Sequence, residues 1–393
     1  MLTSYRRVFA HPGAFAFSLT GLVARLPISM MTLGIILLVS TLTGSYALAG
    51  QVSAAYIIGN AAFAIPHGRL ADRFGQRRVL YVDSVVFAVS TSLMIVSIVR
   101  EWALPWPHVL AALAGAAIPQ IGTMVRARWA HLLDSDAERH TAFAVEGVAD
   151  EVVFVTGPAL VTFLATSFAA ESGLVVAVLV GTVGALGLAV QRHTEPPAHP
   201  RDRSVRRDPM PWAMLAPLTL GAIALGSLFG ALEVATVALA DDAGHKAVSG
   251  LMLGAFALGS LVAGVVAGAT RWERGPLERA RVGMALLAVG TLPLPFLPGL
   301  ATTTVALLVT GLALAPTLIA LFSLIEAAVP ASRLNEAMGF VQTGVSGGIA
   351  PGAWLAGVVA DRSGGDAAYW VCAASAALAA LAGVVVRDTG PVR

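Results

Sequence analysis

Long apolar segments are the sequence feature that most constrains how this chain can fold. Residues 14–39 contain a single charged residue, Arg25, and comparable segments recur along the whole chain. About 20 apolar residues in a helix cross the hydrocarbon core of a bilayer. Because lipid offers no hydrogen-bond partners, a segment that crosses it must satisfy its own backbone groups, as a helix does. The sequence therefore predicts an all-α membrane protein that crosses the bilayer many times.

Composition supports this fold class and excludes several functions. Charged residues form 12% of the 393-residue chain, against about 25% in typical soluble domains. The net charge of +2 is too small for a nucleic-acid-binding protein. Cys372 is the single cysteine, so an intramolecular disulfide is impossible.

Twelve membrane spans are predicted, with short polar joints between them. Their limits are 14–39, 47–67, 79–99, 107–130, 140–166, 172–190, 213–238, 247–269, 281–298, 301–327, 336–360 and 368–386. The polar stretch after the sixth span is rich in arginine and proline. We interpret residues 191–212 as a cytoplasmic linker between an N-terminal bundle of six helices (1–190) and a C-terminal bundle of six helices (213–393).

The distribution of Lys and Arg predicts the orientation of these spans. With the N-terminus in the cytoplasm, 21 of the 25 Lys and Arg residues lie in cytoplasmic segments, 3 lie in external loops, and Arg25 lies within a span. Short loops rich in Lys and Arg remain on the cytoplasmic side of a membrane. Both termini are therefore predicted to be cytoplasmic, which agrees with an even number of spans.

The loop between the second and third spans, residues 68–80, carries the most specific pattern in the sequence. It reads G-R-L-A-D-R-F-G-Q-R-R-V-L, and its glycines suit a close helix contact and a turn. The run resembles the signature loop of the major facilitator superfamily of transporters, G-x-L-a-D-r-x-G-r-k-x-x-l. The matching positions are Gly68, Leu70, Asp72, Arg73, Gly75, Arg77 and Leu80. Gln76 departs from a usually basic position, and Arg78 adds another basic residue.

This resemblance implies two pseudo-symmetric six-helix bundles that alternate access to a central site. In this family, an arginine at the inner end of the fourth span often meets the loop aspartate. Arg126 or Arg128 is therefore expected to hold Asp72 and close the cytoplasmic side, with headgroup contact as the alternative for Arg128. A degraded copy of the loop is expected at 268–275. Residues 357–364 also resemble the loop, and we interpret them as a lookalike turn on the outer side.

Arg25 is predicted to lie near the middle of the first span, where a charge is costly unless it is paired or faces water. Ser18, Gly21, Ser29 and Thr32 lie on the same side of this helix at 100° per residue. The resulting polar stripe is expected to line an aqueous cavity. The alternative is that Arg25 is a buried structural pin, held by a neighbouring helix.

The fifth span carries three acids, Glu146, Asp150 and Glu151. The first two are four residues apart on one helix face, and Glu151 points about 100° away. Counting residues from the cytoplasmic edge predicts two cross-helix pairs, Arg25 with Asp150 and Arg126 with Glu146. A carboxylate that exchanges its arginine for a proton is a physical basis for proton coupling. The alternative is a rigid ion-pair network that never titrates.

Two further features bear on function. Gly157-Pro158, in the fifth span, resembles the core of a motif of the drug–proton antiporter branch, although the other glycines of that motif are absent. This pair is expected to bend the helix. Glu233 lies towards the outer end of the seventh span, where it either serves substrate binding or gating or contacts water. The Gly-Pro pair favours export without deciding it.

The first functional hypothesis is a secondary transporter that couples protons to export of small hydrophobic or amphipathic compounds. Uptake or facilitated diffusion of a small polar or anionic solute is the alternative. A membrane-embedded enzyme or receptor is a remote third reading, because no zinc-protease, Cys/His metal or serine-hydrolase motif and no phosphate loop occurs. Substrate, protons and the bilayer are the expected partners, with no cofactor, metal or nucleic acid. The expected setting is a monomer in a bacterial plasma membrane.

Overall fold

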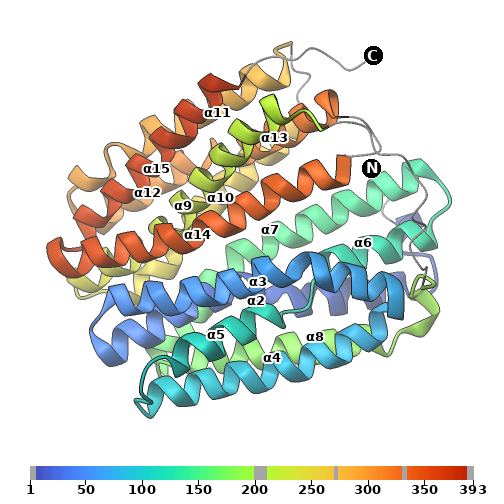
Figure 1. Ribbon diagram of the computed structural model, residues 1–393, viewed down its shortest axis with the longest axis horizontal. Helices are drawn as coiled ribbons and strands as arrows, with labels where there is room; N and C mark the ends of the chain where they lie inside the picture. Colours follow the sequence, from blue (N-terminus) through green and yellow to red (C-terminus); the bar gives the residue numbers. More distant parts are fainter. Residues whose placement is uncertain (1–5, 199–209, 270–272, 330–333, 387–393) are drawn as a thin grey trace. The chain divides into compact units, whose positions relative to one another are not determined.

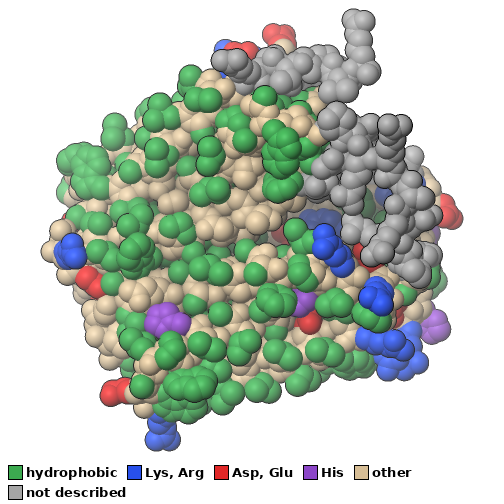
Figure 2. Space-filling view, viewed as in Figure 1, with side chains coloured by type: hydrophobic (Ala, Val, Ile, Leu, Met, Phe, Trp, Pro, Cys, Tyr) green, Lys and Arg blue, Asp and Glu red, His purple; other side chains and the backbone are tan. Residues whose placement is uncertain are grey.

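The computed structural model describes residues 6–198, 210–269, 273–329 and 334–386. Helices dominate these residues, so the predicted all-α membrane fold class is confirmed. Within the described residues, eleven helical segments are long and apolar enough to cross a membrane. Figure 2 shows hydrophobic side chains over much of the visible surface, as expected for a chain whose outer faces contact lipid.

The helices follow one another in two sets (Figure 1). The first set is α2 (Ala14–Thr43), α3 (Tyr46–Phe74), α4 (Gln76–Val99), α5 (Trp106–Ala116), α6 (Ile121–Leu132), α7 (Asp136–Ser167) and α8 (Ser172–Ala189). The second set is α9 (Trp212–Asp242), α10 (Ser249–Ala269), α11 (Pro276–Thr291), α12 (Gly299–Gly311), α13 (Leu314–Ala328), α14 (Leu334–Ser363) and α15 (Gly365–Val385). Three short 3-10 turns accompany them: η1 (Arg192–Thr194), η2 (Lys246–Val248) and η3 (Leu294–Phe296).

The chain divides into two compact units. Unit 1 comprises Met1–Ile35 and Ile58–Arg203, and unit 2 comprises Ile36–Ile57 and Ser204–Arg393. In unit 1, α4 packs against α5 and α8; in unit 2, α9 packs against α14 and α15 (Figure 1). Residues 36–57 thus belong to unit 2, whereas a division of the chain at the linker 191–212 places them in the first bundle.

The predicted ninth span, 281–298, differs most from its helix. α11 begins at Pro276 and ends at Thr291, which makes it 16 residues long. Proline cannot donate a backbone hydrogen bond inside a helix, and Pro293, Pro295 and Pro298 follow within seven residues of its end. The helix therefore stops early and continues as the 3-10 turn η3.

The predicted fourth and tenth spans are each broken into two helices. The fourth becomes α5 and α6, with Pro119 in the gap between Ala116 and Ile121. The Gln120 side-chain amide lies at this break and donates to Asn60 Oδ1 (3.0 Å) and Ile118 O (3.4 Å). The tenth becomes α12 and α13. Non-helical backbone at membrane depth needs such partners, since lipid supplies none.

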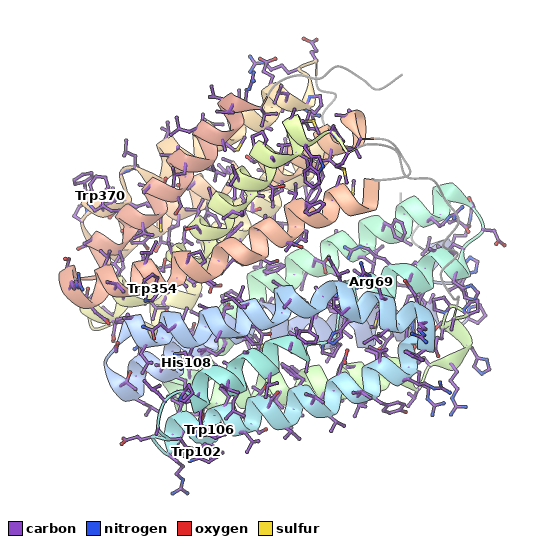
Figure 3. All side chains as sticks on the ribbon, in the orientation of Figure 1. Arg69, Trp102, Trp106, His108, Trp354 and Trp370 are labelled. Carbon is purple, nitrogen blue, oxygen red and sulfur yellow. The ribbon has the colours of Figure 1, made fainter. Side chains whose placement is uncertain are left out.

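The surface of the α4–α5 corner matches a membrane interface. Trp102 and Trp106 lie at this corner with His108, at the end of unit 1 away from Arg69 (Figure 3). The two indoles are 42% and 55% exposed. Tryptophan concentrates at bilayer–water boundaries, where an apolar ring with a polar N–H fits best. This corner is therefore the expected boundary of unit 1 on the side opposite the signature loop.

Candidate functional site

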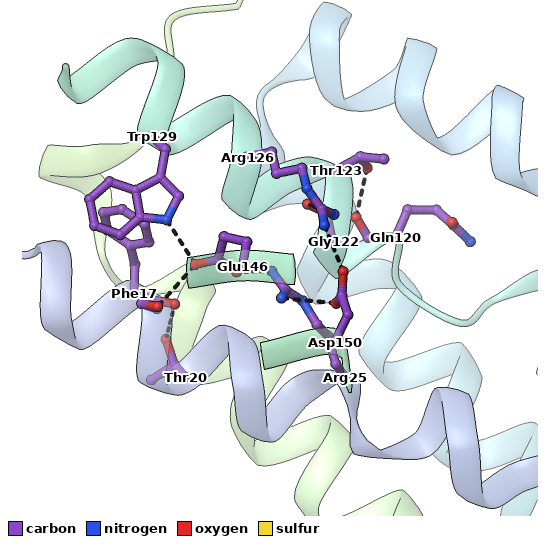
Figure 4. A network of polar contacts seen from close by, with 11 residues as sticks. Phe17, Thr20, Arg25, Gln120, Gly122, Thr123, Arg126, Trp129, Glu146 and Asp150 are labelled. Atoms are coloured by element: carbon purple, nitrogen blue, oxygen red, sulfur yellow. Dashed lines mark hydrogen bonds and ion pairs between the residues drawn. The ribbon is translucent and has the colours of Figure 1, made fainter. Parts of the chain in front are cut away.

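A network of charged side chains in unit 1 joins α2, α6 and α7 (Figure 4). At its centre lies Arg25 of α2, which is 1% exposed. Arg25 Nη1 donates to Asp150 Oδ1 at 3.1 Å, and Nη2 donates to Glu146 Oε2 at 2.5 Å. Both acceptors come from one face of α7, one turn apart. The predicted contact between Arg25 and Asp150 is therefore present.

Glu146 forms the closed end of this network. It is 0% exposed. Besides the guanidinium of Arg25, its carboxylate accepts from Ser18 Oγ (3.0 Å) and from Trp129 Nε1 (2.8 Å). Phe17 packs edge-on against the Trp129 ring, with centroids 4.6 Å apart. A buried carboxylate with three donors is held in one position.

Asp150 and Arg126 form the open end. Arg126 Nη2 donates to Asp150 Oδ2 at 2.6 Å, and the two side chains are 37% and 33% exposed. The predicted pair of Arg126 with Glu146 is wrong, because Trp129 occupies the place beside Glu146. α6 and α7 run antiparallel, so a step forward along α6 is a step back along α7. Asp150 consequently bridges two arginines at the accessible edge.

The predicted polar stripe of α2 is buried against protein in unit 1. Ser18, Ser29 and Thr32 are 8%, 5% and 9% exposed. Ser29 Oγ donates to Val153 O of α7 at 2.9 Å, and a Cβ at Gly21 would meet Val125 of α6. Arg25 itself is buried and held by α7, as in the alternative in which it is a structural pin. The exposed part of this network consists of Asp150 and Arg126.

Gly157 of α7 lies in close contact with α2. A Cβ at this position would overlap the Ser29 hydroxyl. α7 continues through Pro158 as far as Ser167. The side chain of Glu151, the third acid of this helix, lies outside the described residues. Glu233 is half-buried on α9 of unit 2.

Arg128 binds the first residue of α4, the helix that follows the signature loop. It is 0% exposed, so the alternative of headgroup contact is wrong. Its Nε donates to Gln76 Oε1, and its Nη1 donates to Gln191 O and Thr194 Oγ1, each at 2.9 Å. Asp72 is exposed near the end of α3. Arg126 and Arg128 are therefore engaged by other groups than the loop aspartate.

The loop turn itself is sharp, since α3 ends at Phe74 and α4 begins at Gln76. Gly75 between them has φ +88°, a conformation that favours glycine. Arg73, Arg77 and Arg78 line a cavity of about 540 Å³ beside this turn. Arginines in this position suit the headgroup boundary of a membrane, where anionic lipids attract them.

The lookalike turn at 357–364 repeats this geometry. α14 ends at Ser363, Gly364 has φ +86°, and α15 begins at Gly365. Within unit 2, the Asp361 carboxylate accepts from Tyr46 N (2.6 Å), Ala47 N (2.9 Å) and Ser45 Oγ (2.9 Å). Asp361 thus caps the N-terminus of α3. The expected copy at 268–275 includes residues 270–272, which lie outside the described residues.

Two ionisable residues escaped the sequence analysis, His67 of α3 and Asp83 of α4. Both are 6% exposed and their side chains face each other. The sequence does indicate Asp83 as a candidate, because it is an acid inside the apolar segment 79–99. Among the side chains that the structure describes, no group of three or more His, Cys, Asp or Glu could hold a metal ion.

Comparison with known proteins identifies the family. The family model of the Major Facilitator Superfamily matches residues 14–310 and 218–393. The chain therefore belongs to the Major Facilitator Superfamily and is a multi-pass membrane transporter, not an enzyme. No curated protein matches the sequence significantly.

Solved structures agree in fold. A mutant of the nucleoside transporter NupG has a TM-score of 0.76 at 13% identity, over 95% of this chain and 99% of that one. An auto-inhibited peptide transporter of the POT family has a TM-score of 0.73 at 14% identity, over 96% and 98%. The human organic anion transporter MFSD10 has a TM-score of 0.63 at 18% identity, over 96% and 100%. At these identities the likeness concerns the fold alone.

Proposed function

We propose that this chain is a proton-coupled secondary transporter that works by alternating access, with Asp150 as the proton carrier. The observation that carries the proposal is the division of the network into two ends. Glu146 is sealed by three donors, whereas Asp150 is 33% exposed and contacts two arginines. A carboxylate at the accessible edge can exchange an arginine for a proton without unpacking the buried end.

Charge balance determines what proton binding does. Two guanidiniums and two carboxylates give the network no net charge when Asp150 is ionised. Protonation of Asp150 leaves one net positive charge, shared by Arg25 and Arg126. This charge is tolerated while water reaches the open end, and it becomes costly once water is excluded.

An apolar compound bound against the open end would exclude that water. The ion-paired state without net charge would then be favoured, and the proton would leave Asp150. Compound and proton therefore compete, which is the requirement for exchanging one for the other. This competition supports export of small hydrophobic or amphipathic compounds, as the partial antiporter motif at Gly157-Pro158 also does.

An anionic solute would have the opposite effect. It would neutralise the positive charge left after protonation, so that proton and solute bind together. One observation favours this second candidate: Arg25 Nε is buried and has no hydrogen-bond partner among the described residues. Proton-linked uptake of a small anion is therefore the alternative, and MFSD10, a protein of the same fold, is an organic anion transporter.

The sign of proton movement separates the two candidates. The purified chain in sealed liposomes would be given apolar, cationic and anionic compounds, with a pH-sensitive dye inside. Proton release driven by apolar compounds supports export, and proton uptake with anions supports the alternative. Either signal should vanish in Asp150→Asn and persist in Glu273→Gln, an exposed acid. Compound movement without proton flux, unchanged in Asp150→Asn, would overturn the proposal.

We further propose a setting for this activity. The excess of Lys and Arg in alternate loops supports cytoplasmic positions for both termini. The arginine-rich 191–212 stretch would then be a cytoplasmic linker, and the membrane would be a bacterial plasma membrane. A monomer suffices for this mechanism, because the network lies within one chain.

A further inference from the structure

His67 and Asp83 form a buried pair of ionisable side chains outside the network of Arg25. His67 lies on α3, directly before Gly68, and Asp83 lies on α4. The imidazole Nδ1 is 3.4 Å from Asp83 Oδ2, and each side chain is 8% exposed. Both atoms are buried, and neither has a well-formed hydrogen bond with a described group.

Apolar side chains flank this pair on its own two helices. Leu80 and Phe87 flank Asp83 on the buried face of α4 and are 0% and 1% exposed. The Phe63 ring centroid lies 6.0 Å from the centroid of the imidazole. An unpaired charge in such surroundings costs several kcal/mol. The favoured state of the pair is therefore one without net charge.

Apart from the signature-loop residues, the charged groups on the helices around the pair are bound to other groups or exposed. Of the helices packed against α4, α8 carries no ionisable residue and α5 carries His108 at its first turn. On α6, Arg126 and Arg128 are bound to Asp150 and Gln76, and His131 is exposed. The other charged residues of α3 and α4 belong to the signature-loop region: Arg69, Asp72, Arg73, Arg77 and Arg78.

We propose that His67 and Asp83 bind one exchangeable proton as a unit, in a site separate from Asp150. With the proton bound, an imidazolium faces a carboxylate and the pair has no net charge. When the proton leaves, a neutral imidazole faces a carboxylate and one negative charge remains. Two groups this close titrate as a pair and not as individuals.

The position of the pair links its charge to the signature loop. Asp83 lies five residues after Arg78, and His67 lies five residues before Asp72. Five residues of helix span about 8 Å. A negative charge that appears at the pair therefore attracts the loop arginines across a short, poorly screened distance. The site requires no transported compound, so it goes beyond the proposed function and is tested without transport.

Proton counting tests the site directly. The purified full chain in detergent, weakly buffered with an indicator dye, would be moved from about pH 8.5 to about pH 5.5, the range in which histidine sites exchange protons. Asp83→Asn should take up about one proton per chain fewer than wild type, because charging the lone imidazole is then uncompensated. His131→Gln calibrates the loss of one exposed histidine. Asp134→Asn is the matched acid control and should equal wild type, since it is exposed.

A second variant keeps the test decisive if Asp83→Asn does not fold. In infrared spectra recorded against pH, the carboxylate band of Asp83 should persist in wild type between about pH 8.5 and about pH 5.5, because His67 binds the proton. In His67→Gln the band should give way to the band of the protonated acid over this range, because the imidazolium that offsets the carboxylate charge is missing. An unchanged proton count in Asp83→Asn, or a carboxylate band in His67→Gln that behaves as it does in wild type, would show that the two groups do not bind the proton as a unit and would overturn the proposal. Loss of transport in Asp150→Asn leaves this result unaffected.

Discussion

Separate replacement of Glu146 and Asp150 by their amides distinguishes the closed end of the network from its open end. Glu146→Gln leaves the buried guanidinium of Arg25 opposite an uncharged amide. Removing one partner of a buried ion pair costs about 3–5 kcal/mol, because the other charge stays buried. Asp150 still contacts Arg25, so we expect a loss near the lower value, about 3 kcal/mol.

Asp150→Asn should behave in the opposite way. Its side chain and that of Arg126 are about one-third exposed, and partly exposed pairs contribute about 1 kcal/mol or less. Arg25 keeps its contact with Glu146. We therefore expect a small loss of stability and complete loss of compound-driven proton movement. Glu146→Gln should retain that movement at temperatures where it stays folded.

Unfolding of the purified chain in denaturant, followed by tryptophan fluorescence, measures the first quantity, and Trp129 reports on the site because it contacts Glu146. The liposome assay measures the second. Glu273→Gln, at an exposed site, should lie within about 0.5 kcal/mol of wild type. The reasoning is refuted if Asp150→Asn unfolds as easily as Glu146→Gln, or if Glu146→Gln alone abolishes proton movement.

Three further substitutions test the packing around these sites, each by unfolding in denaturant. Gly157→Ala should cost about 1–3 kcal/mol of stability, because the added Cβ overlaps a side chain of α2. Gly147 faces open space on the same helix, so Gly147→Ala should stabilise the chain by up to about 1 kcal/mol. Equal effects of the two substitutions would contradict the close contact at Gly157. Asp361→Asn should cost about 0.5–1 kcal/mol by weakening the cap of α3, and an unchanged stability would count against that cap. Gln76→Arg should cost about 3 kcal/mol by adding a second buried cation, and adding Arg128→Gln should recover part of this loss, which a double-mutant cycle measures.

Most of the fold followed from the lengths of the apolar segments. The observed helix ends differ from the predicted span ends where prolines interrupt the helix over a few residues. Proline at 293, 295 and 298 shortens α11, and Pro119 accompanies the break between α5 and α6. The length of an apolar segment does not reveal such breaks, because the residues on both sides of the break are apolar as well.

The candidate site was predicted in part. The pairing of Arg25 with Asp150 followed from matching depths, but depth alone could not order partners on two antiparallel helices, and Arg126 was assigned to the wrong acid. The pair of His67 and Asp83 could have been found. These residues lie eight positions before and eight positions after Gly75, so a tight turn there brings them to the same level of a helical hairpin.

The departure of Gln76 from the family pattern is explained by the groups around its side chain. Its side chain is 5% exposed and lies between Arg128 Nε and Met124 O, as acceptor to the first and donor to the second. A basic residue here would offer only donors and would bring a second charge beside a guanidinium that is fully buried. An amide satisfies both neighbours. The same arrangement ties Arg128 to the start of α4, which explains why this arginine is unavailable to Asp72. In this chain the residue at the family's usually basic loop position makes a buried contact that fixes α6 to α4, beside the fully buried guanidinium of Arg128.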